Sequence, residues 1–224
     1  MSVQNTAQVP TPRASLRGLY AITPSIATPA EGEHLLAHIK AYLEAGGRII
    51  QWRNKHLDAA TQHKLAAICQ AACAQHDALF IVNDNLALAQ ALDADGLHIG
   101  REDGELTPIR QAWDGLLGVS CYNQLDLGKA AIAAGADYIA FGSIFASQTK
   151  PQAVNAALDL FSASQGWSVP RVAIGGITPD NVAQVIAAGA DAYAVITALF
   201  DLRQSPSHTT AQTQRFLSAA TPTP

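Results

Sequence analysis

The chain has 224 residues, of which 49% are hydrophobic and 14% are charged, and its formal net charge is -4. This apolar fraction is ample for a buried core, which excludes a wholly disordered chain. The mildly acidic balance argues against sequence-independent binding of nucleic acid, which needs a basic surface. No run of the sequence reaches the ~18 to 20 apolar residues of a membrane span. We therefore expect neither nucleic acid nor a membrane as a partner.

The N-terminal segment and the cysteines indicate where the protein resides. Residues 1–15 are polar and lack the apolar core of a signal peptide, so we predict a disordered leader there, a single domain over residues 16–220, and a cytoplasmic location. The chain has an odd number of cysteines, Cys69, Cys73 and Cys121, which is poor evidence for disulfides. Cys69 and Cys73 share one face of a predicted helix, where small packing residues are the favoured interpretation and a zinc site is the alternative.

Short β-rich apolar runs alternate with alanine-rich segments of helical period, which predicts parallel strands joined by crossover helices. Strands are predicted at residues 16–23, 48–53, 79–84, 96–99, 117–121, 138–144, 171–177 and 192–197. Helices are predicted at 33–45, 58–76, a segment ending at 92, 108–113, 125–134, 155–164, a segment starting near 179, and 211–219. Asp58 is the expected N-cap of the second helix.

Eight strand–helix units match the closed (β/α)8 TIM barrel, an α/β fold that forms one domain. The phrase Ala-Gly-Ala-Asp occurs at residues 134–137 and 188–191, each time between a predicted helix and strand, and 93–96 is a looser copy. Glycine there supplies a left-handed helix stop. The alternative is an open doubly wound sheet, but no G-x-G-x-x-G follows the first strand. We predict the TIM barrel.

In such a barrel the chemistry lies at the carboxyl ends of the strands and in the loops after them. Polar residues or glycines follow every predicted strand from the second onward. These segments are 51–55, 83–85, 98–103, 120–122, 147–150, 175–177 and Thr197. Taken singly, Asp84 could cap a helix and His98 could be a core histidine. The joint pattern predicts that polar side chains gather at one rim.

The residue types at this rim fit one chemistry. Arg53, Lys55 and Lys150 can converge on a polyphosphate, since arginine offers a bidentate fork and lysine a point charge. Asp84 and Asp103 supply the oxygen ligands suited to Mg²⁺, which takes one or two carboxylates plus phosphate oxygens and water. We therefore predict a metal–diphosphate site.

A second phosphate site is predicted at Gly175-Gly176, which ends a strand and is expected to open a helix. Exposed backbone amides and the positive end of a helix dipole bind phosphate there. The alternative is that the two glycines only allow close packing.

These residues, in this order, resemble the thiamine-phosphate synthase (thiamine-phosphate pyrophosphorylase) family over residues 16–200. The shared motifs are Q-x-R-x-K, N-D, D-G-x-H-x-G-x-x-D, G-x-S, T-K after a G-x-I-F turn, and A-I-G-G-I. The resemblance implies a (β/α)8 transferase that uses Mg²⁺. It joins hydroxymethylpyrimidine diphosphate to thiazole phosphate by a dissociative substitution, and releases pyrophosphate and thiamine monophosphate.

The resemblance also implies roles for individual residues. The implied substrate-binding set is Gln51, Trp52, Arg53, Asn54, Lys55, Asn83, Ser120, Ser147, Gln148, Thr149, Lys150, Gly175, Gly176, Ile196 and Thr197. Within it, Ser147, Thr149, Gly176, Ile196 and Thr197 match the contacts of the thiazole phosphate. Asp84 and Asp103 match the two magnesium ligands. Arg53, Lys55 and Lys150 are the implied catalytic residues, because they would stabilise negative charge on the leaving pyrophosphate.

Several positions depart from the family pattern. Asn85 replaces an arginine, Arg101 a glutamine and Tyr122 a histidine, and the turn over residues 142–147 lacks the usual prolines. One alternative is a thiazole tautomerase-like isomerase, which resembles the synthase but lacks the diphosphate-binding set and uses a histidine after the fifth strand. The other is a non-catalytic paralogue that binds a thiamine precursor. We expect small-molecule substrates, and a homodimer is an alternative that we keep open.

Overall fold

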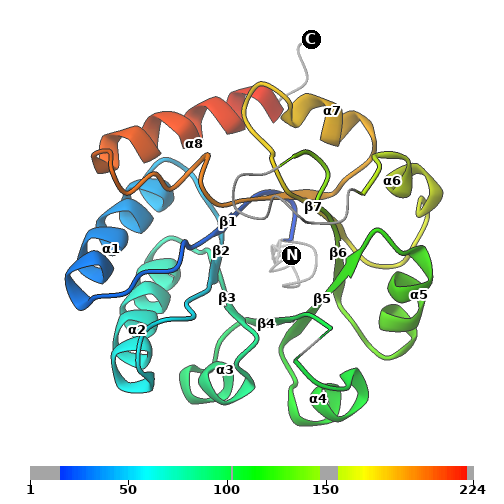
Figure 1. Cartoon of the computed structure of the whole chain (residues 1–224), viewed down its shortest axis with the longest axis horizontal. Coiled ribbons are helices and arrows are strands. Elements are labelled where there is room, and N and C mark those ends of the chain that lie inside the picture. The colour runs from blue at the N-terminus through cyan, green and yellow to red at the C-terminus, as the bar shows by residue number, and fades with distance from the viewer. Residues whose placement is uncertain (1–15, 102, 147–155, 221–224) are drawn as a thin grey trace, which may run out of the picture.

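A computed structural model describes residues 16–101, 103–146 and 156–220 of the chain. Within them, eight parallel strands close into a barrel in sequence order, and β1 pairs with β8 to complete the ring (Figure 1). The strands are β1 (Gly18–Ile22), β2 (Ile49–Trp52), β3 (Leu79–Asn83), β4 (Gly96–Ile99), β5 (Leu116–Tyr122), β6 (Tyr138–Gly142), β7 (Arg171–Ile174) and β8 (Ala192–Val195). The predicted TIM barrel is therefore confirmed.

A helix follows each strand and lies outside the ring (Figure 1). The helices are α1 (Pro29–Glu44), α2 (Ala59–Gln75), α3 (Leu86–Leu92), α4 (Leu106–Ala112), α5 (Leu125–Ala133), α6 (Asp159–Ala163), α7 (Val182–Ala187) and α8 (Pro206–Ala220). In the part of the chain that the structure describes, no helix is both long enough and apolar enough to span a membrane.

Local capping sets where the helices begin. Helix α1 begins at Pro29, before the predicted start at residue 33, because Thr28 and Glu31 form a capping box. Asp58 caps α2 as predicted, accepting a 3.0 Å hydrogen bond from Thr61 N. Helix α3 is capped by Asn85, whose Oδ1 accepts from Leu88 N at 3.0 Å. The alternative role of Asp84 as a helix cap is therefore excluded.

The aspartate of the repeated Ala-Gly-Ala-Asp sequence, and of its looser copy at 93–96, has a structural role at the beginning of the strands. Asp95 Oδ2 accepts a hydrogen bond from Phe80 N at 2.8 Å, Asp137 Oδ2 from Leu117 N at 2.9 Å, and Asp191 Oδ2 from Arg171 N at 3.0 Å. Each carboxylate thus holds the beginning of a neighbouring strand. The three aspartates therefore fix adjacent strands of the barrel to one another, where backbone N–H groups would otherwise lack a partner.

Strand alternation divides the apolar residues between two cores. One core fills the barrel interior and includes Tyr20, Ile49, Ile81 and Tyr138. The larger core lies between the strands and the helices and includes Trp52. Cys69, Cys73 and Cys121 are buried free thiols in this larger core, which confirms the packing interpretation. Among the described residues, no group of three or more His, Cys, Asp or Glu side chains could hold a metal, so the zinc alternative has no support.

Candidate active site at the mouth of the barrel

The mouth of the barrel is the end at which the eight strands finish. At this end β1 and β2 are tied together by Thr23, a buried residue just after β1. Its hydroxyl donates to Arg53 O at 3.0 Å and accepts from Arg53 N at 2.8 Å. The Arg53 guanidinium donates to Ser25 Oγ at 3.2 Å. Arg53 is therefore held at the mouth by its backbone, and its guanidinium lies beside the loop that follows β1.

Lys55 is carried by a short loop that Asn54 organises. Asn54 Oδ1 accepts from His56 N and Leu57 N, both at 2.9 Å, and Asn54 Nδ2 donates to Ile26 O at 3.0 Å. The polar atoms of the Asn54 side chain are thereby used within the protein. Asn54 shapes the loop that presents Lys55.

Asp84 follows β3 directly and adopts a left-handed conformation, with a φ of 62°. Its backbone N donates to His98 O at 2.8 Å, so the residue is anchored on the neighbouring strand β4. The Asp84 carboxylate lies 3.3 Å from Lys55 Nζ. A non-glycine residue at positive φ is strained, and such strain concentrates at functional sites.

Asp103 lies in the loop after β4 and faces Asp84. Its Oδ2 accepts a 2.6 Å hydrogen bond from Gly100 N. Burial raises the pKa of the Asp103 carboxyl, and the neighbouring Asp84 carboxyl raises it further, whereas the Gly100 N–H and Lys55 oppose the rise. The two carboxylates predicted as metal ligands are therefore brought together, although they lie 19 positions apart in the sequence.

This acidic pair fits a magnesium ion. Burial and then the neighbouring Asp84 raise the pKa of Asp103, and a cation between the two carboxylates would favour their charged forms. Mg²⁺ is bound in proteins by one or two carboxylates, with substrate phosphates and water completing its shell. The donor set of Asp84 and Asp103 is of this kind.

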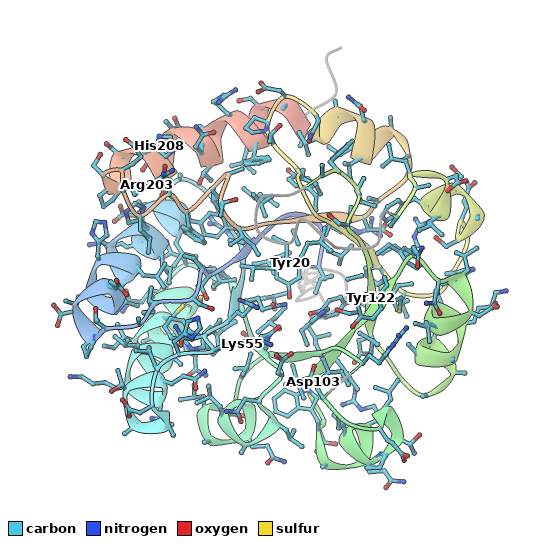
Figure 2. All side chains as sticks on the ribbon, in the orientation of Figure 1. Tyr20, Lys55, Asp103, Tyr122, Arg203 and His208 are labelled. Atoms are coloured by element: carbon cyan, nitrogen blue, oxygen red, sulfur yellow. The ribbon has the colours of Figure 1, made fainter. Side chains whose placement is uncertain are left out.

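Two of the departures from the family pattern contact each other. The Arg101 guanidinium lies over the Tyr122 ring, 5.1 Å from its centroid, and Arg101 N donates to Tyr122 Oη at 3.4 Å. Tyr122 ends β5 with a φ of 54°, next to a register shift between β5 and β6. Figure 2 shows Lys55, Asp103 and Tyr122 around the barrel axis, whereas Arg203 and His208 lie at the periphery.

Inside the mouth, five side chains from five strands form one hydrogen-bonded chain. Gln51 Nε2 donates to Tyr20 Oη at 2.8 Å, and Tyr20 Oη lies 2.9 Å from Tyr138 Oη. Tyr138 Oη lies 3.0 Å from His98 Nδ1, and His98 Nε2 lies 2.9 Å from Ser120 Oγ. Gln51 and Ser120 were predicted from the sequence, whereas Tyr20 and Tyr138 were not. Their hydroxyls at inward strand positions were the available signal.

Trp52 requires a correction. It was expected among the substrate-binding residues of the mouth, but its side chain is 1% exposed and packs in the core between the barrel and the helices. The reason is strand alternation, because Gln51 points into the barrel and the next residue must point away from it.

The glycines after β7 also differ from the prediction. Helix α7 begins at Val182, six residues after Gly176, so the glycine pair does not open a helix. A Cβ on Gly175 would lie 2.1 Å from Ser143 Oγ, and one on Gly176 would lie 2.6 Å from Ala146 O. The φ of 107° at Gly175 also favours glycine, and the close contacts of a Cβ exclude a side chain at Gly176. The pair therefore packs against the chain that follows β6.

Two more predicted residues lie at the end of β8. Ile196 and Thr197 follow the strand directly, and Thr197 is exposed. Asn83 ends β3 and is partly buried at the mouth. Four predicted residues, Ser147, Gln148, Thr149 and Lys150, lie outside the described residues, as does the predicted leader at 1–15.

The sequence and the fold are similar to those of one protein family. The sequence model of the family described as thiamine monophosphate synthase matches residues 19–199. The chain is 47% identical over 188 residues to the thiamine-phosphate synthase of Thioalkalivibrio sulfidiphilus, which covers 83% of this chain and 88% of that protein. It is 48% identical over 193 residues to the thiamine-phosphate synthase of Aromatoleum aromaticum, which covers 85% of this chain and 91% of that protein.

A solved structure supports the same assignment. The thiamine phosphate pyrophosphorylase from Pyrococcus furiosus superposes with a TM-score of 0.79 at 27% identity, covering 92% of this chain and 96% of that one. Tryptophan synthase from Mycobacterium tuberculosis superposes with a TM-score of 0.69 at 15% identity, a likeness of fold alone. The chain belongs to the thiamine monophosphate synthase family.

Proposed function

We propose that this chain is a thiamine-phosphate synthase, a transferase that joins hydroxymethylpyrimidine diphosphate to thiazole phosphate and releases pyrophosphate. The observation that carries the proposal is the cluster of Asp84, Asp103 and Lys55 at the mouth of a barrel of this family. Two carboxylates and a cation in contact suit a metal-bound diphosphate. A site for a single phosphate would not need the acidic pair.

The reaction exchanges one bond at the pyrimidine methylene carbon for another. The C–O bond to the diphosphate breaks, its electron pair leaves with pyrophosphate, and the thiazole nitrogen supplies the pair for the new C–N bond. The chain therefore needs no nucleophile of its own. Lys55 and Arg53, together with Lys150, would stabilise the negative charge that develops on the leaving group.

The acidic pair would hold the metal. When bound, Mg²⁺ neutralises charge on the leaving diphosphate. Asp84 and Asp103 would provide its protein ligands, and Lys55 lies 3.3 Å from Asp84, where it can contact the same diphosphate. Gln51, Asn83 and Ser120 would line the pyrimidine side. Gly176, Ile196 and Thr197, with Ser147 and Thr149, would contact the thiazole phosphate, as the resemblance to the family implies.

Closing both substrates into one site would remove much of the entropic barrier, about 7 to 11 kcal/mol in well-oriented reactions. Water must also be excluded from the cationic pyrimidine that a dissociative path generates. We propose a cytoplasmic location as well, which the three free cysteines support, because disulfides persist in oxidising compartments.

The test is an assay of the purified chain with Mg²⁺ and both phosphorylated precursors. We expect thiamine monophosphate and pyrophosphate in equal amounts, and a loss of turnover of at least about tenfold in Lys55→Ala because a charge beside the leaving group is removed. Lys129→Ala, in an exposed lysine of α5, is the matched control and should be unchanged.

Two outcomes would contradict the proposal. Tight binding of one precursor without pyrophosphate release would identify a precursor-binding paralogue. Isomerisation of a thiazole substrate without use of the diphosphate would identify the tautomerase-like alternative.

A further inference from the structure

The buried chain of side chains from Gln51 to Ser120 crosses the barrel interior. It uses one residue from each of β2, β1, β6, β4 and β5, and every step is a hydrogen bond of 2.8 to 3.0 Å. Tyr20 and Tyr138 are each 1% exposed. Buried polar groups in a low-dielectric interior are costly unless each has a partner, so the chain is held as a unit.

The chain has a direction. Gln51 Nε2 can only donate, so Tyr20 Oη accepts from it and donates its own proton to Tyr138 Oη. Tyr138 then donates to His98 Nδ1, which leaves the proton of the neutral imidazole on Nε2, facing Ser120 Oγ. If Tyr138 instead donated to Tyr20, the Tyr20 hydroxyl proton would have no acceptor. The direction that satisfies every group leaves the Ser120 hydroxyl proton as a donor.

The backbone makes room for this chain at Gly118. A Cβ at Gly118 would lie 2.0 Å from Tyr138 Cζ and 2.3 Å from Tyr138 Oη. The tyrosine ring therefore lies directly over the glycine. Because Gly118 and Tyr138 are register partners on β5 and β6, the hydroxyl reaches His98 on β4 across the intervening strand. Gly118 is thus required for the central link of the chain.

We infer that Tyr20, Tyr138 and His98 are positioning residues that fix Gln51 as an acceptor and Ser120 as a donor toward the pyrimidine, and so select an aminopyrimidine over its oxo analogue. This inference rests on the proposed function. An aminopyrimidine offers an amino N–H and a bare ring nitrogen, which Gln51 Oε1 and the Ser120 hydroxyl complement. In the oxo analogue a carbonyl and a ring N–H replace them, which reverses both hydrogen bonds.

The test measures selectivity, as the ratio of kcat/KM for the amino substrate to that for the matched oxo-pyrimidine diphosphate. Tyr138→Phe keeps the ring but breaks the chain at its centre, so we expect the ratio to fall by about tenfold or more. Tyr20→Phe should act in the same way. The KM for thiazole phosphate should be unchanged in both variants.

Two other buried tyrosines provide matched controls. Tyr193 Oη has no hydrogen-bond partner among the described residues, so Tyr193→Phe should leave selectivity unchanged. The Tyr42 hydroxyl lies 3.0 Å from both Leu19 O and Ile49 O, and its one proton is donated to these backbone acceptors. Tyr42→Phe should therefore lower stability without altering the ratio. An unchanged ratio in Tyr138→Phe and Tyr20→Phe would overturn the inference.

A second measurement needs no variant and no turnover. Nitrogen-15 NMR of the wild-type chain at neutral pH reports which ring nitrogen of His98 carries the proton. We expect protonation at Nε2, and protonation at Nδ1 would overturn the inference. Absence of turnover by the wild type with the amino substrate would instead count against the proposed function, so the two failures are distinguishable.

Discussion

The backbone conformation of Asp84 places its carboxylate in the candidate metal site at the mouth of the barrel. Its φ of 62° turns the chain immediately after β3, and its N–H is held by His98 O on β4. The carboxylate is thereby brought to Lys55 and Asp103. Asn85, the next residue, caps α3 and fixes the direction in which the chain continues. One dipeptide thus supplies both a candidate metal ligand and the beginning of a helix.

At this scale we predict that Asp84→Asn lowers metal-dependent turnover by more than about tenfold, because it removes the charge of one carboxylate ligand. The amide retains the size of the side chain, so the melting temperature should stay close to that of the wild type. Steady-state kinetics at saturating Mg²⁺ and a thermal melt check both parts. Asp126→Asn, in an exposed residue of α5, is the control. An unchanged rate in Asp84→Asn would remove Asp84 from the metal site.

At the scale of elements, short helices depend on their caps. Helix α3 has seven residues, and the Asn85 side chain satisfies one of its first backbone N–H groups. The resemblance to the family implies an arginine at this position, and an arginine side chain offers no acceptor for an N-cap. The Asn85 side chain therefore stabilises the beginning of α3 in this chain.

We expect Asn85→Ala to lower the free energy of unfolding by about 1 kcal/mol, the usual cost of losing an N-cap side chain. Asn85→Asp keeps the acceptor oxygen and should stay within a few tenths of a kcal/mol of the wild type. Chemical denaturation of the three proteins measures the difference. Equal losses in both variants would show that the cap is not what Asn85 contributes.

Helices and strands could be predicted from the sequence where the interactions that define them are between residues close together in the chain. The strands were predictable because their apolar period is local, and Asp58 because a cap lies beside its helix. The start of α1 was predicted four residues too late, although Thr28 and Glu31 have the spacing of a capping box. Trp52 was wrongly predicted to bind substrate because it lies between polar residues in the sequence. Alternate residues of a strand point to opposite faces, so Trp52 points away from the barrel interior.

Tyr20 and Tyr138 could not be predicted as partners, because their contact depends on the register of several strands. The gathering of Asp84 and Asp103 could be predicted, because parallel strands of a barrel deliver their carboxyl ends to one rim.

At the scale of the whole molecule, α1 and α8 pack together beside the β1–β8 seam that closes the barrel (Figure 1). Between them His38 is fully buried, and its Nδ1 lies 2.7 Å from Thr209 Oγ1. Burial lowers the pKa of His38, and the nearby His34 and His208 lower it further, while Gln204 and Asp201 oppose the shift. The closing contact of the fold therefore contains a buried histidine whose pKa is lowered.

This predicts a pH dependence of stability. Unfolded histidine has a pKa of about 6.5, so below this pH the unfolded chain binds a proton that folded His38 resists. The free energy of unfolding should thus be fully retained above about pH 6.5 and fall as the pH decreases toward the lower folded pKa. Denaturation at about pH 7 and 5.5 measures the fall, which should be smaller in His38→Gln than in the wild type. His63→Gln changes an exposed histidine and should match the wild type. An equal decrease in the free energy of unfolding in all three proteins would show that His38 is not the cause.

Asp84, Asp103 and Lys55 lie together, and we propose that they form a site for a metal-bound diphosphate. Calorimetric titration of the chain with inorganic pyrophosphate, with and without Mg²⁺, tests this claim most directly. We expect binding that requires Mg²⁺ and that is lost when Asp84 and Asp103 are both changed to asparagine. Pyrophosphate affinity that is the same without Mg²⁺, or the same in the double variant, would contradict it.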